Sequence, residues 1–351
     1  MSKAFGLDIG ATSIKAVWLG IEKNVFQLIS HTMVPTPAKG ILSESPLDME
    51  EIAGAIKKAV ETAKIATKNV NIALAENQVY TKIIEMPALS DKELSLAINW
   101  EAEQYIPVPL SSVYLVWTVL NPAQKNQKKM SNKIQVLVIG APIITINKYQ
   151  KILAMSGLNV VAIETEILSV VRALTYQREV SKTNFPPTVI LNMGSVSTAL
   201  ALVIDKIIAF TYSIPVGGIA INRAIEADLG VSLIQAEEYK KVYGISRGSN
   251  SERIGKAVTP ILNSILSEVK KVMVFYSQKY KEHGPIQQII LSGGTAKLPG
   301  IDLFFADHCG IETVTANPWT ILVNDKALPQ DLRNTASDYT VAIGLAMREY
   351  D

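Results

Sequence analysis

Residues 5–17, FGLDIGATSIKAV, decide how the rest of the chain is interpreted. Apolar residues alternate up to Ile9, small and hydroxylated residues follow from Gly10 to Ser13, and apolar residues return at Ile14. This pattern predicts a strand, a tight turn and a second strand. A turn built from small residues leaves backbone N–H groups unshielded, and such groups suit an anionic phosphate.

Two charged side chains flank this turn. Asp8 lies at the end of the first strand, and Lys15 follows a few residues beyond the turn. A carboxylate beside a phosphate is favourable mainly when a divalent metal lies between the two anions. The stretch by itself is ambiguous, because a hairpin with glycine in its turn is common.

The chain repeats this pattern, which favours the phosphate interpretation. Residues 191–198, LNMGSVST, match residues 7–13 and follow an apolar run. A third apolar run, 289–291, leads to Gly293 and Gly294. Ligands of open α/β sheets bind where strands end, so three strands ending near glycine predict three backbone walls around one ligand.

Composition restricts the class of protein. A chain of 351 residues allows two domains, and a formal net charge of +2 gives no general case for binding nucleic acid or acidic membranes. One cysteine, Cys309, fits a reducing compartment, and three scattered histidines show no spacing for a zinc site. The longest apolar run, 134–146, is too short to cross a bilayer, and no signal peptide precedes the first strand. We expect a soluble, cytoplasmic protein.

Hydrophobic periodicity and capping residues predict the remaining elements. Strands are predicted at 5–9, 14–19, 25–34, 70–75, 79–86, 113–120, 134–141, 160–163, 189–193, 198–204, 207–213, 289–291 and 312–315. Helices are predicted at 52–63, 147–155, 164–179, 218–229, 251–281 and 337–350, with others opening at 90, 232 and 299. Capping boxes at 48–51 and 90–93 would begin two of them. The basic stretch 121–129 lacks aromatic residues for base stacking, so it is interpreted as a solvated loop.

These elements form two halves with the same plan. The first, 1–184, would include an inserted β-rich subdomain at 70–143, and the second, 185–351, a helical insertion at 217–284. The polar stretch 182–187, with two prolines, is the predicted boundary. We expect the C-terminal helix to pack back on the first half.

Several short motifs resemble the actin-like ATPase superfamily in their order and spacing along essentially the whole chain. They are LDIG at 7–10 with Lys15, MGS at 193–195, Gly217-Gly218, AEEYK at 236–240, SGG at 292–294 with LPG at 298–300, and AIGLA at 342–346. Two further stretches, 86–90 with 100–107 and 214–218, are similar to the PilM branch, which acts in type IV pilus assembly and is related to FtsA.

The resemblance implies an α/β, two-lobed actin-like (ribonuclease H-like) fold, with mixed sheets flanked by helices and ATP with Mg²⁺ between the lobes. By match to the family's motifs, the β-phosphate would be held by Gly10, Ala11, Thr12, Ser13 and Lys15. The γ-phosphate side would be formed by Gly194, Ser195, Gly217 and Gly218, and the ribose and adenine side by Glu237, Lys240, Gly293 and Gly294. Asp8 would orient magnesium-bound water, and Glu166 is the candidate for positioning the attacking water.

The chain departs from the family at Asn192, where many actin-like ATPases carry an acidic residue. A neutral amide holds an attacking or metal-bound water less firmly. We therefore predict nucleotide binding with slow or absent hydrolysis, well below about 1 s⁻¹.

The resemblance also implies a partner, the N-terminal cytoplasmic tail of a PilN-like inner-membrane protein. The tail would bind in a groove of the first lobe beside the inserted subdomain and recruit the chain to the inner membrane, with no insertion of its own. Contacts with other pilus assembly proteins and self-association are further expectations. Whether the system builds pili or a type II secretion machine stays open. Trp100, on the helix of that subdomain, is interpreted as a core residue.

Two other functions are compatible with the superfamily. An FtsA-like filament protein is disfavoured because no amphipathic anchor follows the predicted last helix. A small-molecule kinase would need an aspartate base in the cleft, and the sequence offers no persuasive candidate.

Overall fold

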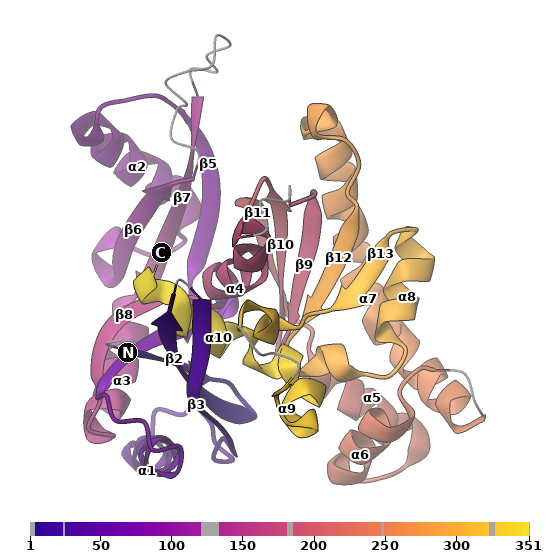
Figure 1. Ribbon diagram of the computed structural model, residues 1–351. Helices are drawn as coiled ribbons and strands as arrows, with labels where there is room; N and C mark the ends of the chain where they lie inside the picture. Colours follow the sequence, from indigo (N-terminus) through magenta and orange to yellow (C-terminus); the bar gives the residue numbers. More distant parts are fainter. Residues whose placement is uncertain are drawn as a thin grey trace.

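Two five-stranded sheets with the same strand order form the framework of the computed structural model (Figure 1), which describes residues 4–23, 25–120, 133–180, 185–246, 249–322 and 327–350. The first sheet has the order β3-β2-β1-β4-β8 and the second β11-β10-β9-β12-β13. The first consists of β1 (Phe5–Ile9), β2 (Ser13–Glu22), β3 (Val25–Pro35), β4 (Asn69–Leu74) and β8 (Asn159–Thr165). The second consists of β9 (Thr188–Met193), β10 (Thr198–Ile204), β11 (Ile207–Ile214), β12 (Gln288–Ser292) and β13 (Glu312–Thr315).

Strand directions repeat as well as strand order. In each sheet the first three strands in sequence pair antiparallel, and the two that follow extend the sheet in parallel. The internal repeat predicted from the sequence is therefore confirmed at the level of topology. The predicted boundary at 184/185 and the basic connection 121–129 fall on residues outside the described ranges, and the division into two lobes stays a prediction.

A third sheet, of order β5-β7-β6, stands beside the two large ones. It consists of β5 (Tyr80–Pro87), β6 (Val113–Val119) and β7 (Lys133–Pro142), and α2 (Asp91–Tyr105) packs on it. The predicted subdomain 70–143 is wrong at its start, because β4 belongs to the first sheet between β1 and β8. A continuous run of buried residues in β4 is typical of a parallel strand covered on both faces.

The helix α2 confirms one prediction and corrects another. Its capping box is present, with the Ser90 amide donating to Glu93 Oε2 at 3.1 Å. The assignment of Trp100 to the core is wrong, since its exposed fraction is 74%. Leu94, Ile98 and Ala102 form the buried stripe instead, and Trp100 lies off that stripe.

Each large sheet is covered by its own helices. On the first sheet these are α1 (Pro46–Thr62) and α3 (Ile143–Met155). On the second sheet they are α5 (Gly218–Leu229), α6 (Leu233–Tyr243), α7 (Ser249–Lys279) and α8 (Ile301–Cys309). The short helix α9 (Gln330–Asn334) precedes α10 (Thr340–Met347).

Three helices differ from prediction by more than two residues at a boundary. Helix α1 begins at Pro46 rather than behind a cap at 48–51, because proline is favoured in the first turn, where its missing N–H costs no hydrogen bond. Helix α3 begins at Ile143, directly after β7, rather than at 147. The predicted C-terminal helix 337–350 is α-helical only in α10, with 3₁₀ turns at Ala336–Tyr339 and Arg348–Tyr350.

Helices α4 (Glu166–Val180) and α10 lie between the two large sheets (Figure 1). Helix α10 contacts β1, β2 and α4, and α4 contacts β9 and β10. The end of the described chain thus packs against its first strand and against the helix that connects the two sheets. Within the described ranges, none of the helices has the length and apolarity needed to cross a membrane.

Candidate functional site

Three loops at strand ends meet at one cavity of about 590 Å³. They follow β1 at 10–13, β9 at 194–197 and β12 at 293–295. Pockets of this size accept ordinary cofactors. The sequence-based expectation that the three glycine-ended strands surround a common space agrees with this geometry.

The first two loops have the same backbone geometry. The Gly10 amide donates to Ser13 O at 3.1 Å, and the Gly194 amide donates to Ser197 O at 2.9 Å. In the part of the chain that the structure describes, no hydrogen bond occupies the loop amides of Ala11, Thr12, Ser195 and Val196. Exposed amides in a tight turn form a concave site for an anion, so the two loops can act as a pair of phosphate cradles.

The third loop requires glycine at its bend. Gly293 has φ of +83°, and a Cβ there would lie 2.6 Å from Met193 O. Only glycine adopts this conformation so close to another backbone. Its amide donates to Ser337 O, which ties the loop to the turn before α10.

A buried ion pair lies beside the first loop. Lys15 Nζ is 2.9 Å from Asp8 Oδ2, and both side chains are about nine-tenths buried. Burial by itself lowers the pKa of Lys15, but the neighbouring Asp8 carboxylate holds that pKa above its usual value. Lys15 therefore stays cationic next to Gly10, where it can attract an anion.

Behind this pair lie two more carboxyl groups. Glu166 Oε2 accepts a hydrogen bond from Asn192 Nδ2 at 3.0 Å, and Glu76 Oε1 accepts one from the Ile167 amide at 2.7 Å. The second oxygen of Glu76 is buried, and no described residue bonds it. Burial, together with the charges of Glu76 and Asp8, raises the pKa of Glu166 well above its usual value.

The free energy of unfolding should fall as pH rises from 4.5 to about 7, because burial raises the pKa of Glu76 from 4.5 to about 7. In that window the folded protein keeps a proton that the unfolded chain has lost, at a cost on the order of 3 kcal/mol for one group. Glutamine does not titrate, so Glu76→Gln should remove the part of the fall in unfolding free energy between pH 4.5 and about 7 that comes from Glu76. Urea unfolding at pH 5 and pH 7 measures it, and an unchanged pH dependence in the variant would contradict the assignment.

The opposite side of the cavity carries a second ion pair. Glu237 accepts hydrogen bonds from Lys240 Nζ at 2.5 Å and from Asn222 Nδ2 at 2.6 Å. Burial raises the pKa of Glu237, but these donors outweigh it and leave the pKa lowered. Glu237 is therefore ionised, and its free lone pairs can accept hydroxyl or amine donors of a ligand.

The structure brings together nearly all of the site residues predicted from sequence. The cavity is lined by Asp8, Gly10, Ala11, Thr12, Ser13, Lys15, Glu166, Asn192, Gly194, Ser195, Gly218, Glu237, Lys240, Gly293 and Gly294. Gly217 does not line the cavity. It lies behind the second loop, where a Cβ would be 2.7 Å from Gly194 O. The functional roles assigned to these residues stay predictions.

Sequence reasoning missed Asp338 and Lys297, which form an ion pair in the lining of the cavity. Neither residue belongs to a glycine-ended strand. The one available signal was an aspartate set among small and apolar residues just before α10. Such a carboxylate is rarely buried without a partner, and Asp338 is only 7% exposed.

The donor set fits magnesium only together with a ligand. No cluster of three or more His, Cys, Asp or Glu side chains among the described residues is arranged to hold a metal. Mg²⁺ is commonly held by one or two carboxylates plus substrate phosphates and water. Asp8 beside a phosphate cradle meets that requirement, so the residues present fit a magnesium–nucleotide complex better than a bare metal ion.

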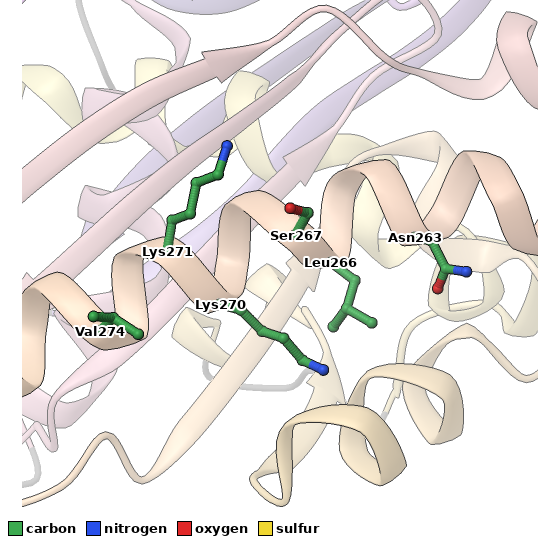
Figure 2. A pocket seen from close by; sticks show the side chains of 6 residues that line it. All are labelled: Asn263, Leu266, Ser267, Lys270, Lys271 and Val274. Carbon is green, nitrogen blue, oxygen red and sulfur yellow. The ribbon is translucent and has the colours of Figure 1, made fainter.

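Two other hollows lie away from this cavity. One, of about 560 Å³, is formed on α7 by six residues of that helix alone (Figure 2), where Lys270 and Lys271 point away from each other. Lys271 also pairs with Glu268 at 2.7 Å, so the two cations do not converge on a ligand. The other, of about 300 Å³, lies between β5 and the end of α2 on the third sheet.

Comparisons with known proteins identify the family. The family model described as "Type IV pilus assembly protein PilM" matches residues 6–350. A solved "PilM-PilN type IV pilus biogenesis complex" superposes with a TM-score of 0.86 at 26% identity, covering 99% of both chains.

Two more distant proteins are also similar to this chain. MreB 5 of Spiroplasma citri, solved bound to AMPPNP, matches with a TM-score of 0.50 at 15% identity over 98% of this chain and 95% of its own. The cell division protein FtsA of Enterococcus faecalis is 23% identical over 332 residues, 84% of this chain and 74% of FtsA. The predicted actin-like α/β fold is confirmed, and the chain belongs to the type IV pilus assembly protein PilM family.

Proposed function

We propose that this chain binds ATP with Mg²⁺ in the three-loop cavity and acts as an adaptor in type IV pilus assembly. The adaptor would dock the N-terminal cytoplasmic tail of a PilN-like inner-membrane protein and couple nucleotide state to the assembly complex. The observation that carries the nucleotide proposal is the pair of matching loops with unoccupied amides beside the Asp8–Lys15 pair.

The proposed roles follow the positions of the residues in the cavity. The loop from Gly10 to Ser13 and Lys15 would hold the β-phosphate, while Gly194, Ser195 and Gly218 would face the γ-phosphate, supported from behind by Gly217. Glu237, Lys240, Gly293 and Gly294 would border the ribose and adenine. Magnesium would supply positive charge between the phosphates and Asp8.

Slow hydrolysis is proposed from the groups nearest the γ-phosphate side. Asn192 is neutral and donates its amide N–H to Glu166. Burial, together with the charges of Glu76 and Asp8, raises the pKa of Glu166 well above its usual value, which favours the protonated form that cannot accept a proton from an attacking water. Both features point to a nucleotide-bound state that persists, which suits a switch more than a fast ATPase.

The hollow on the third sheet is the proposed docking groove for the tail. It is mostly apolar, and Lys82 Nζ lies 4.8 Å from the centre of the Tyr105 ring at its border. Extended peptides commonly bind by placing side chains in such pockets, with a few polar groups fixing their orientation.

A binding titration tests the adaptor proposal. A fluorescent synthetic peptide of the N-terminal tail of the membrane protein encoded beside this chain is titrated with the full-length protein, with and without MgATP. Saturable binding is expected, and Tyr105→Ala should weaken it at least tenfold because part of the groove wall is lost. Tyr114→Ala is the matched control, since Tyr114 is similarly exposed on β6 but outside the groove. No saturable binding to wild type would refute the proposal.

The likeness to FtsA favours one alternative, a filament-forming protein of the same fold. Sedimentation with MgATP distinguishes the two functions. A filament protein appears in the pellet above a critical concentration, whereas an adaptor stays in the supernatant and binds the tail peptide.

A further inference from the structure

The third sheet, although its strands come from the first half of the chain, touches the second half. Strand β5 is an edge strand of the third sheet and contacts β11, the edge strand of the second large sheet (Figure 1). Ile83 of β5 packs against the apolar cluster that includes Ala199 of β10 and Ile208 of β11. The two edges are not hydrogen-bonded to each other, so side chains hold this contact.

Two polar contacts join the third sheet to the end of α7. Lys279 Nζ is 2.5 Å from Glu85 Oε1 of β5, and Gln135 Nε2 of β7 donates to the Tyr280 hydroxyl at 3.2 Å. The Lys279 ammonium also lies 5.6 Å from the centre of the Phe275 ring and 5.5 Å from that of Tyr280. We call these two contacts, Glu85–Lys279 and Gln135–Tyr280, the strap.

The pKa values of both partners in the Glu85–Lys279 ion pair are shifted in the direction that keeps them charged. The hydrogen bond from Lys279 lowers the pKa of Glu85. Burial lowers the pKa of Lys279, but Glu85 and Tyr280 outweigh this effect and leave it raised. Both groups therefore carry full charge over the physiological range. They remain partly exposed, so the pair adds little to stability, and its removal should leave the fold intact.

The strap connects the two proposed binding sites through continuous elements. Successive side chains of a strand point to opposite faces, so Tyr80, Lys82 and Ile84 of β5 line the groove while Ile83 and Glu85 face the second half. At its other end α7 is tied to α6 by Ser251 Oγ, which donates to Tyr243 O at 2.9 Å. Helix α6 carries Glu237 and Lys240 in the three-loop cavity.

We propose that the strap couples the nucleotide cavity to the tail groove, through the path α6, α7, Lys279, Glu85 and β5. The inference rests on the function proposed above and adds its means of regulation. A ligand that moves α6 and α7 relative to the first half displaces Lys279, and β5 follows because the strap holds it. Coupling between two sites is reciprocal, so the tail changes ATP affinity by the same factor as ATP changes tail affinity.

The coupling factor is the ratio of the dissociation constants of the tail peptide measured without and with saturating MgATP. Its value in strap variants tests the inference. In full-length wild type, the dissociation constant of the tail peptide should change about fivefold or more when saturating MgATP is added. In Lys279→Glu the change should shrink to less than about twofold, while the protein still binds each ligand. The double variant Glu85→Lys/Lys279→Glu restores the opposite charges and should recover the wild-type factor.

Lys271→Glu is the matched control on the same helix, because Lys271 pairs with Glu268 within α7 and not with the third sheet. It should keep the wild-type coupling factor. The inference is overturned if MgATP leaves tail affinity unchanged in wild type, or if Lys279→Glu keeps the full factor. Absence of any tail binding in wild type overturns the adaptor function as well, so the two failures are distinguishable.

Discussion

Replacing Gly344 with alanine should lower the free energy of unfolding by roughly 3 kcal/mol or more, at the upper end of what overpacking causes. A Cβ at Gly344 would lie 1.9 Å from Ser169 O and 2.5 Å from its carbonyl carbon. These are backbone atoms of α4, so no side chain can swing away to make room. Either α10 or α4 must shift.

On its opposite side, α10 lies equally close to the backbone of β1. A Cβ at Gly6 of β1 would lie 2.1 Å from Ala342 O. Arg172 donates to Gly344 O at 3.0 Å, and Asn71 donates to Leu345 O at 3.1 Å. Helix α10 is therefore fixed between β1 and α4 by backbone contact, and a displacement on one side is resisted on the other.

Thermal and urea unfolding of Gly344→Ala and Gly54→Ala measure the effect. Gly54 is an exposed residue inside α1, where a Cβ would meet nothing within 4 Å. The same substitution there should stabilise the protein by up to about 1 kcal/mol, because alanine is the better helix former. Equal stabilities of the two variants would refute the backbone-contact argument.

Local patterns predicted the parts of the fold that depend on local physics. Alternating apolar residues ending at glycine located β1, β9 and β12, and the match of residues 7–13 to 191–198 predicted two sheets of the same plan. Helix caps located α2 and α6 to within a few residues. The signal for each of these elements lies within the element or at its ends, and the repeat shows that the same local signal occurs twice along the chain.

Features set by distant contacts were not predictable in this way. The position of β4 between β1 and β8 depends partly on a strand far along the chain, whereas the local pattern groups β4 with β5, its neighbour in sequence. Trp100 has a large aromatic side chain of the kind usually found in a core. Only the orientation of α2 on its sheet shows that this side chain is exposed. The placement of Asp338 in the cavity follows from the packing of α10, which no short motif encodes.

Among substitutions at the cavity, Lys15→Met should have the largest effect, weakening MgATP binding at least 100-fold. Methionine keeps most of the side-chain volume but removes the ammonium group that lies 2.9 Å from Asp8. In the proposed complex this ammonium would pair with a phosphate, and removing one partner of a buried charge pair at a binding interface typically costs about 2–5 kcal/mol of binding free energy, with each 1.4 kcal/mol corresponding to tenfold in affinity. Asp8 would then lose its partner in the protein, and only the magnesium of the bound MgATP would offset its charge beside the phosphates, with Glu166 and Glu76 close behind it.

Lys240→Met is the matched control on the other side of the cavity. Lys240 is also paired with a carboxylate, but Glu237 is about one-third exposed and keeps a second cation, Lys241, at 3.5 Å. Loss of the Lys240 ammonium group should therefore weaken MgATP binding by about tenfold or less. Isothermal titration calorimetry with MgATP measures both variants, with circular dichroism verifying that each is folded. A folded Lys15→Met protein with affinity within threefold of wild type would mean that triphosphate does not bind beside the first loop, because no anion bound at Gly10 could be indifferent to that charge.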